Sequence, residues 1–292
     1  MMPRKLSQQY FKGTRPYLLC ACLLVLVASA TQVAGNRLPT AMQAQRPSEW
    51  WHERHVQKLE EARKGDAEIV LIGDSITQYG ERDPLYGYYF GNRKVLNLGF
   101  GGDGTEQVLW RLQNGELEGV NPKLVALMIG TNNARNQSAE AILAGIEAIL
   151  DELALRVPNA KVILFSVFPR GQEREQAVLE AVNRELAGFA ERSQVLHLDL
   201  NPQFYRETGE LNPELYYHDL LHLSSQGYQL WYAALEPHIS AALGLAPLPA
   251  NPHRAVQSVH RGGPRHEQKL REVAEEDYQL VFVGDSITHF WE

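Results

Sequence analysis

Five short, largely aliphatic runs stand out from the otherwise mixed sequence, and turn-forming residues bound each of them. They cover residues 69–72, 95–98, 124–129, 162–167 and 195–199. Apolar runs of this length, without a regular polar face, are typical of strands buried on both sides in the middle of a parallel sheet. The pattern therefore predicts a sheet of five strands.

Between these runs, apolar residues recur every three or four positions, which is the period of an amphipathic helix. Helices are predicted over 49–64, 105–112, 138–156, 173–192 and 224–243. Strands that alternate with helices build parallel sheets covered on both faces. We therefore expect an α/β fold over residues 48–245, a doubly wound, flavodoxin-like parallel five-stranded sheet with helices on both faces.

The first aliphatic run ends in Gly73-Asp74-Ser75, and this corner carries the first candidate for chemistry. Gly73 permits backbone angles closed to other residues, and Asp74 can accept hydrogen bonds from nearby amides. Ser75 stands where the next helix would begin. In open α/β sheets ligands bind at the carboxyl ends of strands, so Ser75 is a candidate nucleophile. The alternative is a serine that only caps the helix.

Other strand ends supply the partners that such a nucleophile needs. Gly102 follows the second run, Asn132 follows the third, and Asp219 precedes His222 by three positions. On one helical turn or in a compact loop, that carboxylate can reach the imidazole Nδ1 and leave Nε2 facing Ser75. A hydroxyl, a base, an orienting carboxylate and N–H donors together are the parts of a serine hydrolase.

Four separated motifs resemble those of the SGNH or GDSL hydrolases. They are Gly73-Asp-Ser75, Gly102, Gly130-Thr-Asn132 and Asp219-Leu-Leu-His222. The resemblance implies the SGNH hydrolase fold, no cofactor and no metal. It also implies Ser75 as nucleophile, His222 as base and Asp219 as its partner. The oxyanion hole would consist of the Ser75 and Gly102 backbone N–H groups and the Asn132 side chain.

Within that family, further segments resemble the catalytic subunits of intracellular platelet-activating factor acetylhydrolase. They are 96–105, 108–117, 169–171 and 221–224. The resemblance implies hydrolysis of short-chain, chiefly acetyl, esters, and no long insertion is present that could form a lipase lid. The substrate is expected to be a small-molecule, glycan or lipid ester. A lysophospholipase or phospholipid esterase is the alternative function. The protein could also form a homodimer.

Three rival interpretations come from other features. Residues 99–104 form a GxGxxG between a strand and a helix. A dinucleotide site also expects an acidic residue about 20 residues on, at the end of the following strand, but here the strand that starts at Leu124 ends in Gly-Thr-Asn-Asn. Two histidine pairs could be zinc ligands, His52 with His55 and His218 with His222. The first pair lacks the HExxH spacing of a zinc site, and the segment of the second is better explained as a base and its orienting carboxylate. A non-catalytic carbohydrate-binding module would use tyrosines near predicted loops, although these rings more often cover a core. They are Tyr86, Tyr88, Tyr89, Tyr216 and Tyr217.

The N-terminus has the order of a secretory signal peptide: basic residues, an uncharged run over 17–30, then small residues. We expect a signal peptide over 1–34, a linker over 35–47 and a secreted or periplasmic protein. The run is shorter than the ~18 residues of a membrane span, and an uncleaved anchor is the alternative. Cleavage would remove both cysteines and change the formal charge from −7 to −11, which argues against nucleic acid as a partner.

Beyond the predicted domain, residues 246–265 are rich in proline and form a second linker. Residues 266–292 then repeat 55–81, including a second Gly-Asp-Ser at Ser286. We expect the start of a second, truncated SGNH-like repeat. Ser286 should be inert because no further base or oxyanion motif follows it. The alternative is a domain swap in which the repeat replaces the first strand of a neighbouring molecule.

Overall fold

The computed structural model describes residues 48–248. The predicted signal peptide (1–34), the first linker (35–47) and the repeat (266–292) lie outside the described residues, as does most of the second linker. Within residues 48–248, no helix is both long enough and apolar enough to cross a membrane.

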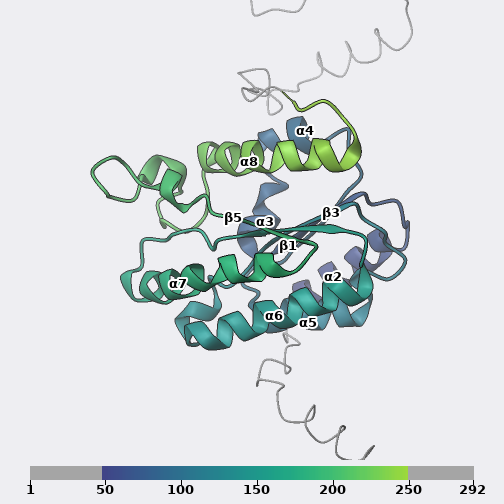
Figure 1. The fold of residues 1–292 in the computed structure, drawn as a ribbon, viewed down its shortest axis with the longest axis horizontal. Coiled ribbons are helices and arrows are strands. Elements are labelled where there is room, and N and C mark those ends of the chain that lie inside the picture. Colours follow the sequence, from purple (N-terminus) through teal and green to yellow (C-terminus); the bar gives the residue numbers. More distant parts are fainter. Residues whose placement is uncertain (1–47, 249–292) are drawn as a thin grey trace, which may run out of the picture. The chain divides into compact units, whose positions relative to one another are not determined.

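A five-stranded parallel sheet forms the middle of the fold (Figure 1). Its spatial order is β2-β1-β3-β4-β5. The chain passes from β1 to β2 on one side and then to β3 on the other, so the strand order reverses between β1 and β3. In such sheets, ligands bind beyond the carboxyl ends of the strands at this reversal. The fold class is thus confirmed. The strands are β1 (Ile69–Gly73), β2 (Val95–Gly99), β3 (Leu124–Met128), β4 (Lys161–Phe165) and β5 (Val195–Leu198).

Helices cover both faces of the sheet, as Figure 1 shows. One face carries α3 (Ser75–Gly80), α4 (Pro84–Phe90) and α8 (Ser225–Leu243). The other carries α2 (Glu49–Ala62), α5 (Thr105–Arg111), α6 (Ala139–Arg156) and α7 (Glu173–Leu186). A π-helical turn, η2, spans Leu112–Glu116, and 3₁₀ turns lie at η3 (Asn133–Arg135), η4 (Ala187–Glu191), η5 (Asn201–Phe204) and η6 (Pro213–Leu215).

The double cover explains the aliphatic runs, because every residue of β1 and β3 is buried. Serine caps begin two of the long helices: Ser138 accepts a hydrogen bond from Ala141, and Ser224 accepts one from Gly227. Helix α8 ends at Gly244, which has the left-handed conformation (φ +69°) of a common helix terminus.

Two elements differ from the sequence prediction. Helix α4 was not predicted because apolar and aromatic residues fill most of its seven positions and leave no polar face, although Asp83 caps it and Pro84 is its first residue. The predicted helix over 173–192 divides into α7 and the 3₁₀ turn η4.

The tyrosines considered for sugar binding mostly belong to the core. Tyr89 and Tyr216 are buried, and Tyr86 and Tyr88 are half-buried against the same cluster. Only Tyr217 among these five is exposed. Packing therefore accounts for four of the five rings.

Candidate active site

The tight corner between β1 and α3 presents Ser75 as the first residue of the helix. Asp74 caps α3, because its Oδ1 accepts the Ile76 N–H at 2.9 Å. The sequence argument for Gly73 was wrong in its reason, since its φ is not positive. Glycine is required instead by close packing: a Cβ here would lie 2.5 Å from the Met128 carbonyl oxygen.

Ser75, His222 and Asp219 form a continuous hydrogen-bonded series. The Ser75 Oγ lies 2.9 Å from His222 Nε2, and His222 Nδ1 donates to Asp219 Oδ2 at 2.6 Å. Because Nδ1 faces a carboxylate, it carries the proton, and Nε2 is left to accept the Ser75 hydroxyl proton. The structure therefore brings together the three residues that the sequence predicted would meet.

The charge of Asp219 is stabilised within its own loop. Partial burial raises the pKa of this carboxyl, but hydrogen bonds from the His222 side chain and from the His222 and Leu221 backbone N–H groups outweigh that effect. The net result is a pKa below the ordinary value for aspartate. Asp219 is thus an anion wherever His222 would need to become an imidazolium.

The loop that carries this pair is compact rather than helical, and α8 begins only at Ser225. Tyr217 N–H donates to the His222 carbonyl oxygen at 2.8 Å, which closes the loop on itself. Leu220 takes a left-handed conformation with φ +50°, which is costly for a leucine. Its carbonyl oxygen accepts the Gly171 N–H at 2.8 Å, so the loop is also docked on the segment after β4.

Arg170, which the sequence argument quoted only within a resembling segment, links two parts of the site. Its Nη1 donates to the Thr131 carbonyl oxygen at 3.0 Å, next to Asn132. Its Nε donates to Gln172, whose amide in turn donates to the Asp219 carbonyl oxygen at 3.1 Å. The side chain thereby ties the end of β3 to the loop of the base.

Gly102 and Asn132 line the same pocket as Ser75 and His222, a cavity of about 460 Å³. Gly102 has φ +77°, which only glycine adopts readily. One N–H of the Asn132 amide donates to the Asp103 carbonyl oxygen at 2.9 Å. An amide has two N–H donors, so a second is available to a ligand in the pocket.

The pocket is also lined by residues that sequence reasoning did not single out, among them Trp50, Arg82 and Arg135. Trp50 is 43% exposed, and the two arginines contribute the cationic lining. The Arg82 guanidinium lies 4.9 Å from the centre of the Tyr79 ring. In the part of the chain that the structure describes, neither arginine forms an ion pair. Only their positions shortly after Ser75 and Asn132 in the sequence hint at this placement.

Asp74 has an environment opposite to that of Asp219. It is completely buried, and within residues 48–248 its Oδ2 has no hydrogen-bond partner. Burial raises the pKa of Asp74 to about 7, against the lowering effect of its bond to the Ile76 N–H. The carboxyl is therefore largely protonated in mildly acidic solution.

The histidines weighed as metal ligands have other contacts. His55 Nδ1 lies 2.9 Å from Glu116 Oε1, and His222 is occupied by Ser75 and Asp219. Across residues 48–248, no three histidine, cysteine, aspartate or glutamate side chains come together as a metal site.

Comparison with known proteins agrees with this fold. The model of the GDSL-like lipase/acylhydrolase family matches residues 71–230. Platelet-activating factor acetylhydrolase IB subunit alpha1 of Homo sapiens is 37% identical over 196 residues, 65% of this chain and 83% of that subunit. The alpha2 subunit of Rattus norvegicus is 32% identical over 194 residues, 65% of this chain and 84% of that subunit.

Among solved structures, a GDSL-like lipase from Bacteroides thetaiotaomicron superposes with a TM-score of 0.54 at 22% identity, over 65% of this chain and 98% of the other. The chain belongs to the GDSL-like lipase/acylhydrolase family. It is an enzyme that hydrolyses ester bonds, so the interpretation as a non-catalytic carbohydrate-binding module is wrong.

Proposed function

We propose that this protein is an exported serine esterase that removes short acyl groups, chiefly acetyl, through an acyl-enzyme. The observation that carries the proposal is the Ser75–His222–Asp219 series, with a hydroxyl-to-imidazole distance of 2.9 Å at the wall of a 460 Å³ pocket.

In the acylation step, the Ser75 Oγ attacks the ester carbonyl carbon while His222 Nε2 takes the hydroxyl proton. Asp219 stabilises the imidazolium that forms, through its 2.6 Å bond to Nδ1. The carbonyl oxygen becomes an oxyanion, which accepts hydrogen bonds from the Ser75 and Gly102 N–H groups and the second Asn132 N–H. Ser75 is the first residue of α3, where backbone N–H groups lack partners within the helix.

Collapse of this intermediate breaks the bond to the alcohol oxygen, which takes the proton from His222 Nε2. Water then enters, loses a proton to the same nitrogen and attacks the acyl carbon. The bond between the acyl carbon and Ser75 Oγ breaks, the acid leaves, and Oγ takes the proton back from His222 Nε2. Every catalytic group in these two steps belongs to the polypeptide, and water is the second reactant.

The acetyl preference is supported by the names of the relatives, which are acetylhydrolases at 32–37% identity. The test is a series of 4-nitrophenyl esters from acetyl to octanoyl. We expect kcat/KM to be highest for acetyl and to fall as the chain lengthens. A maximum at eight carbons would overturn the acetyl preference and leave the esterase mechanism standing.

A phospholipid esterase is the second candidate, and the pocket lining favours it specifically. Arg82 and Arg135 could pair with a phosphate, and Trp50 and Leu221 offer apolar contact. The test compares a short-chain phospholipid with an acetylated neutral sugar. If phosphate is recognised, Arg82→Gln and Arg135→Gln should raise KM several-fold for the phospholipid alone. The exposed Arg63→Gln, in the segment after α2, is the control. Equal changes in KM for both substrates would contradict the phospholipid esterase proposal.

Export rests on the order of charges and apolar residues over 1–34. Expression of the full chain and of a chain starting at residue 35 provides the test. We expect the full chain in the exported fraction with a shortened N-terminus, and the truncated chain inside the cell. An unprocessed full chain inside the cell would contradict export.

A further inference from the structure

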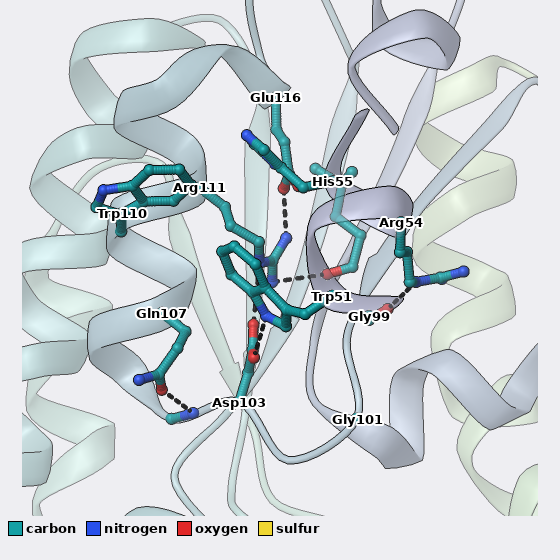
Figure 2. Close-up of polar contacts among 12 residues, drawn as sticks. Trp51, Arg54, His55, Gly99, Gly101, Asp103, Gln107, Trp110, Arg111 and Glu116 are labelled. Atoms are coloured by element: carbon teal, nitrogen blue, oxygen red, sulfur yellow. Dashed lines mark hydrogen bonds and ion pairs between the residues drawn. The ribbon is translucent and has the colours of Figure 1, made fainter. Parts of the chain in front are cut away.

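A buried polar cluster lies against the loop that joins β2 to α5 (Figure 2). Asp103 of that loop accepts hydrogen bonds from Trp51 Nε1 at 2.8 Å and from Arg111 Nε at 3.0 Å. Arg111 also pairs with Glu116, whose other oxygen lies 2.9 Å from His55 Nδ1. These five residues, called the Asp103 cluster below, come from α2, the loop, α5 and η2.

The cluster places ionised groups where solvent cannot reach them. The side chains of Asp103, Arg111 and Glu116 are all 0% exposed. Removing such charges from water costs several kcal/mol for each ion, and apolar replacements of buried pairs are often as stable or more so. Stability is therefore a weak explanation for three buried charges. Their location beside the pocket suggests a role in the active site instead.

The same loop is anchored along its length. Arg111 also lies over Phe100, with its Cζ 3.8 Å from the ring centre. Three backbone groups are held by side chains of neighbouring helices: the Leu98 carbonyl oxygen by Arg111 (3.1 Å), the Gly99 carbonyl oxygen by Arg54 (2.9 Å) and the Gly101 N–H by Gln78 (2.6 Å).

Asp103 connects this anchoring to two of the proposed oxyanion donors, the Gly102 N–H and the Asn132 amide. It follows Gly102 directly, and its backbone N–H donates to the Phe100 carbonyl oxygen at 3.2 Å, so the clamped Asp103 closes a turn whose central peptide carries the Gly102 N–H. Its carbonyl oxygen accepts the Asn132 amide at 2.9 Å and so orients the second N–H of that amide. We infer that the Asp103 cluster is a positioning device that aims the Gly102 and Asn132 donors at the developing oxyanion, an inference that rests on the proposed function.

The contribution of α2 extends beyond the part of the chain that the family model matches. That match begins at residue 71, whereas Trp51 and His55 precede it. The π-helical turn η2 has a similar role, since it brings Glu116 back to Arg111 through a positive φ at Gly115 (+103°). π-Helical turns are often found at functional sites. Helix α2 and the turn η2 thus close the cluster around Asp103.

The principal test uses Asp103→Asn, which keeps the size of the side chain but removes the charge opposite Arg111. Donors must lie about 2.7–3.1 Å from the oxyanion, which exists only in the transition state, so misaiming them lowers kcat rather than substrate binding. We expect kcat on 4-nitrophenyl acetate to fall roughly 10- to 100-fold, with KM within about threefold. Trp51→Phe, which loses only one donor and some volume, should act in the same direction more weakly.

Glu236→Gln is the matched control. Glu236 pairs with Arg93 in a second buried ion pair, on α8 at the opposite face of the sheet. This variant should lower the melting temperature and leave kcat within about twofold. If Asp103→Asn and Trp51→Phe lowered kcat no more than Glu236→Gln does, the cluster would be structural only and the inference would fail.

A double-mutant cycle with Asn132→Ala gives a readout that general destabilisation does not move. If Asp103 acts through the donors, Asp103→Asn should cost at least threefold less in the Asn132→Ala background. Equal factors in the two backgrounds would overturn the inference. Failure of the proposed function is seen separately, as activity that survives in Ser75→Ala.

Discussion

On the base side of the site, residues 216–223 hold Asp219 and His222 largely by bonds within that loop, and both side chains stay partly exposed, at 39% and 22%. On the oxyanion side, segment 98–103, which is the end of β2 and most of the loop to α5, is held by side chains from several helices, and Asp103 and Arg111 are entirely buried. The base side therefore depends on the charge of one accessible carboxylate, whereas the oxyanion side depends on long-range packing.

The difference follows from what each side does. The base must take up and release a proton, which requires nearby water and a histidine that can change its charge. The oxyanion donors carry no proton away, and their value lies in fixed geometry inside a site shielded from solvent. We therefore expect the two sides to respond differently to substitution and to pH.

The largest effect should come from removing the nucleophile or the base itself. Ser75→Ala and His222→Ala should each lower kcat on 4-nitrophenyl acetate by several orders of magnitude, because nucleophile and base act as a unit. The double variant should be little worse than either single one. If the fall in kcat of the double variant were the product of the falls in the two single variants, Ser75 and His222 would not act as a unit.

Next in size is the base side alone. Asp219→Asn should lower kcat by roughly 10³- to 10⁴-fold, because a neutral amide neither fixes the Nδ1–H tautomer nor stabilises the imidazolium. The lowered pKa of Asp219 means that its favourable contribution is present above the unfolded-state pKa and is lost as pH falls through the folded-state value. Unfolding in urea should show less loss of stability at acid pH in Asp219→Asn than in the wild type, and parallel curves would contradict the assignment.

The base side was also the easier side to predict. Asp219 and His222 lie three residues apart, so local spacing alone predicted their contact. The aliphatic runs predicted all five strands for a similar reason, since burial on both faces leaves a continuous apolar signal. These features depend on short stretches of sequence.

The oxyanion side could be predicted only in part. Gly102 and Asn132 were placed by strand ends and by resemblance. The support from Trp51 and Arg111 was not foreseen, because it joins segments 52 and eight positions away from Asp103. Nothing in a local window shows which arginine meets which buried aspartate. Gly73 gives a similar lesson, because its requirement comes from packing against β3 rather than from its own φ.

Removing one oxyanion donor tests the oxyanion side alone and should have a smaller effect on kcat. Asn132→Ala should lower kcat by about 10²- to 10³-fold with little change in KM, as loss of one oxyanion donor does in other hydrolases. Asn136→Ala, four positions on and exposed, is the control and should change neither constant. A tenfold rise in KM at unchanged kcat would show that Asn132 binds substrate instead.

The smallest expected change concerns stability rather than rate. Asp74 has a folded-state pKa raised from about 3.8 to about 7, so between these values the folded state binds the extra proton. Stability should fall as pH rises through this window, by about 4 kcal/mol at most. Asp74→Asn, measured by urea unfolding from pH 4 to pH 8, should remove that part of the slope. An unchanged slope would show that Asp74 ionises normally.

The central claim is that Ser75 is the nucleophile, activated by His222. A fluorophosphonate probe followed by peptide mass analysis tests it most directly, since the probe modifies only an activated serine. We predict a single adduct on Ser75 in the wild type, much slower labelling in His222→Ala, and no adduct on Ser286 in Ser75→Ala. Labelling of another serine while Ser75 stays unmodified, or ester hydrolysis that persists in folded Ser75→Ala, would contradict the account.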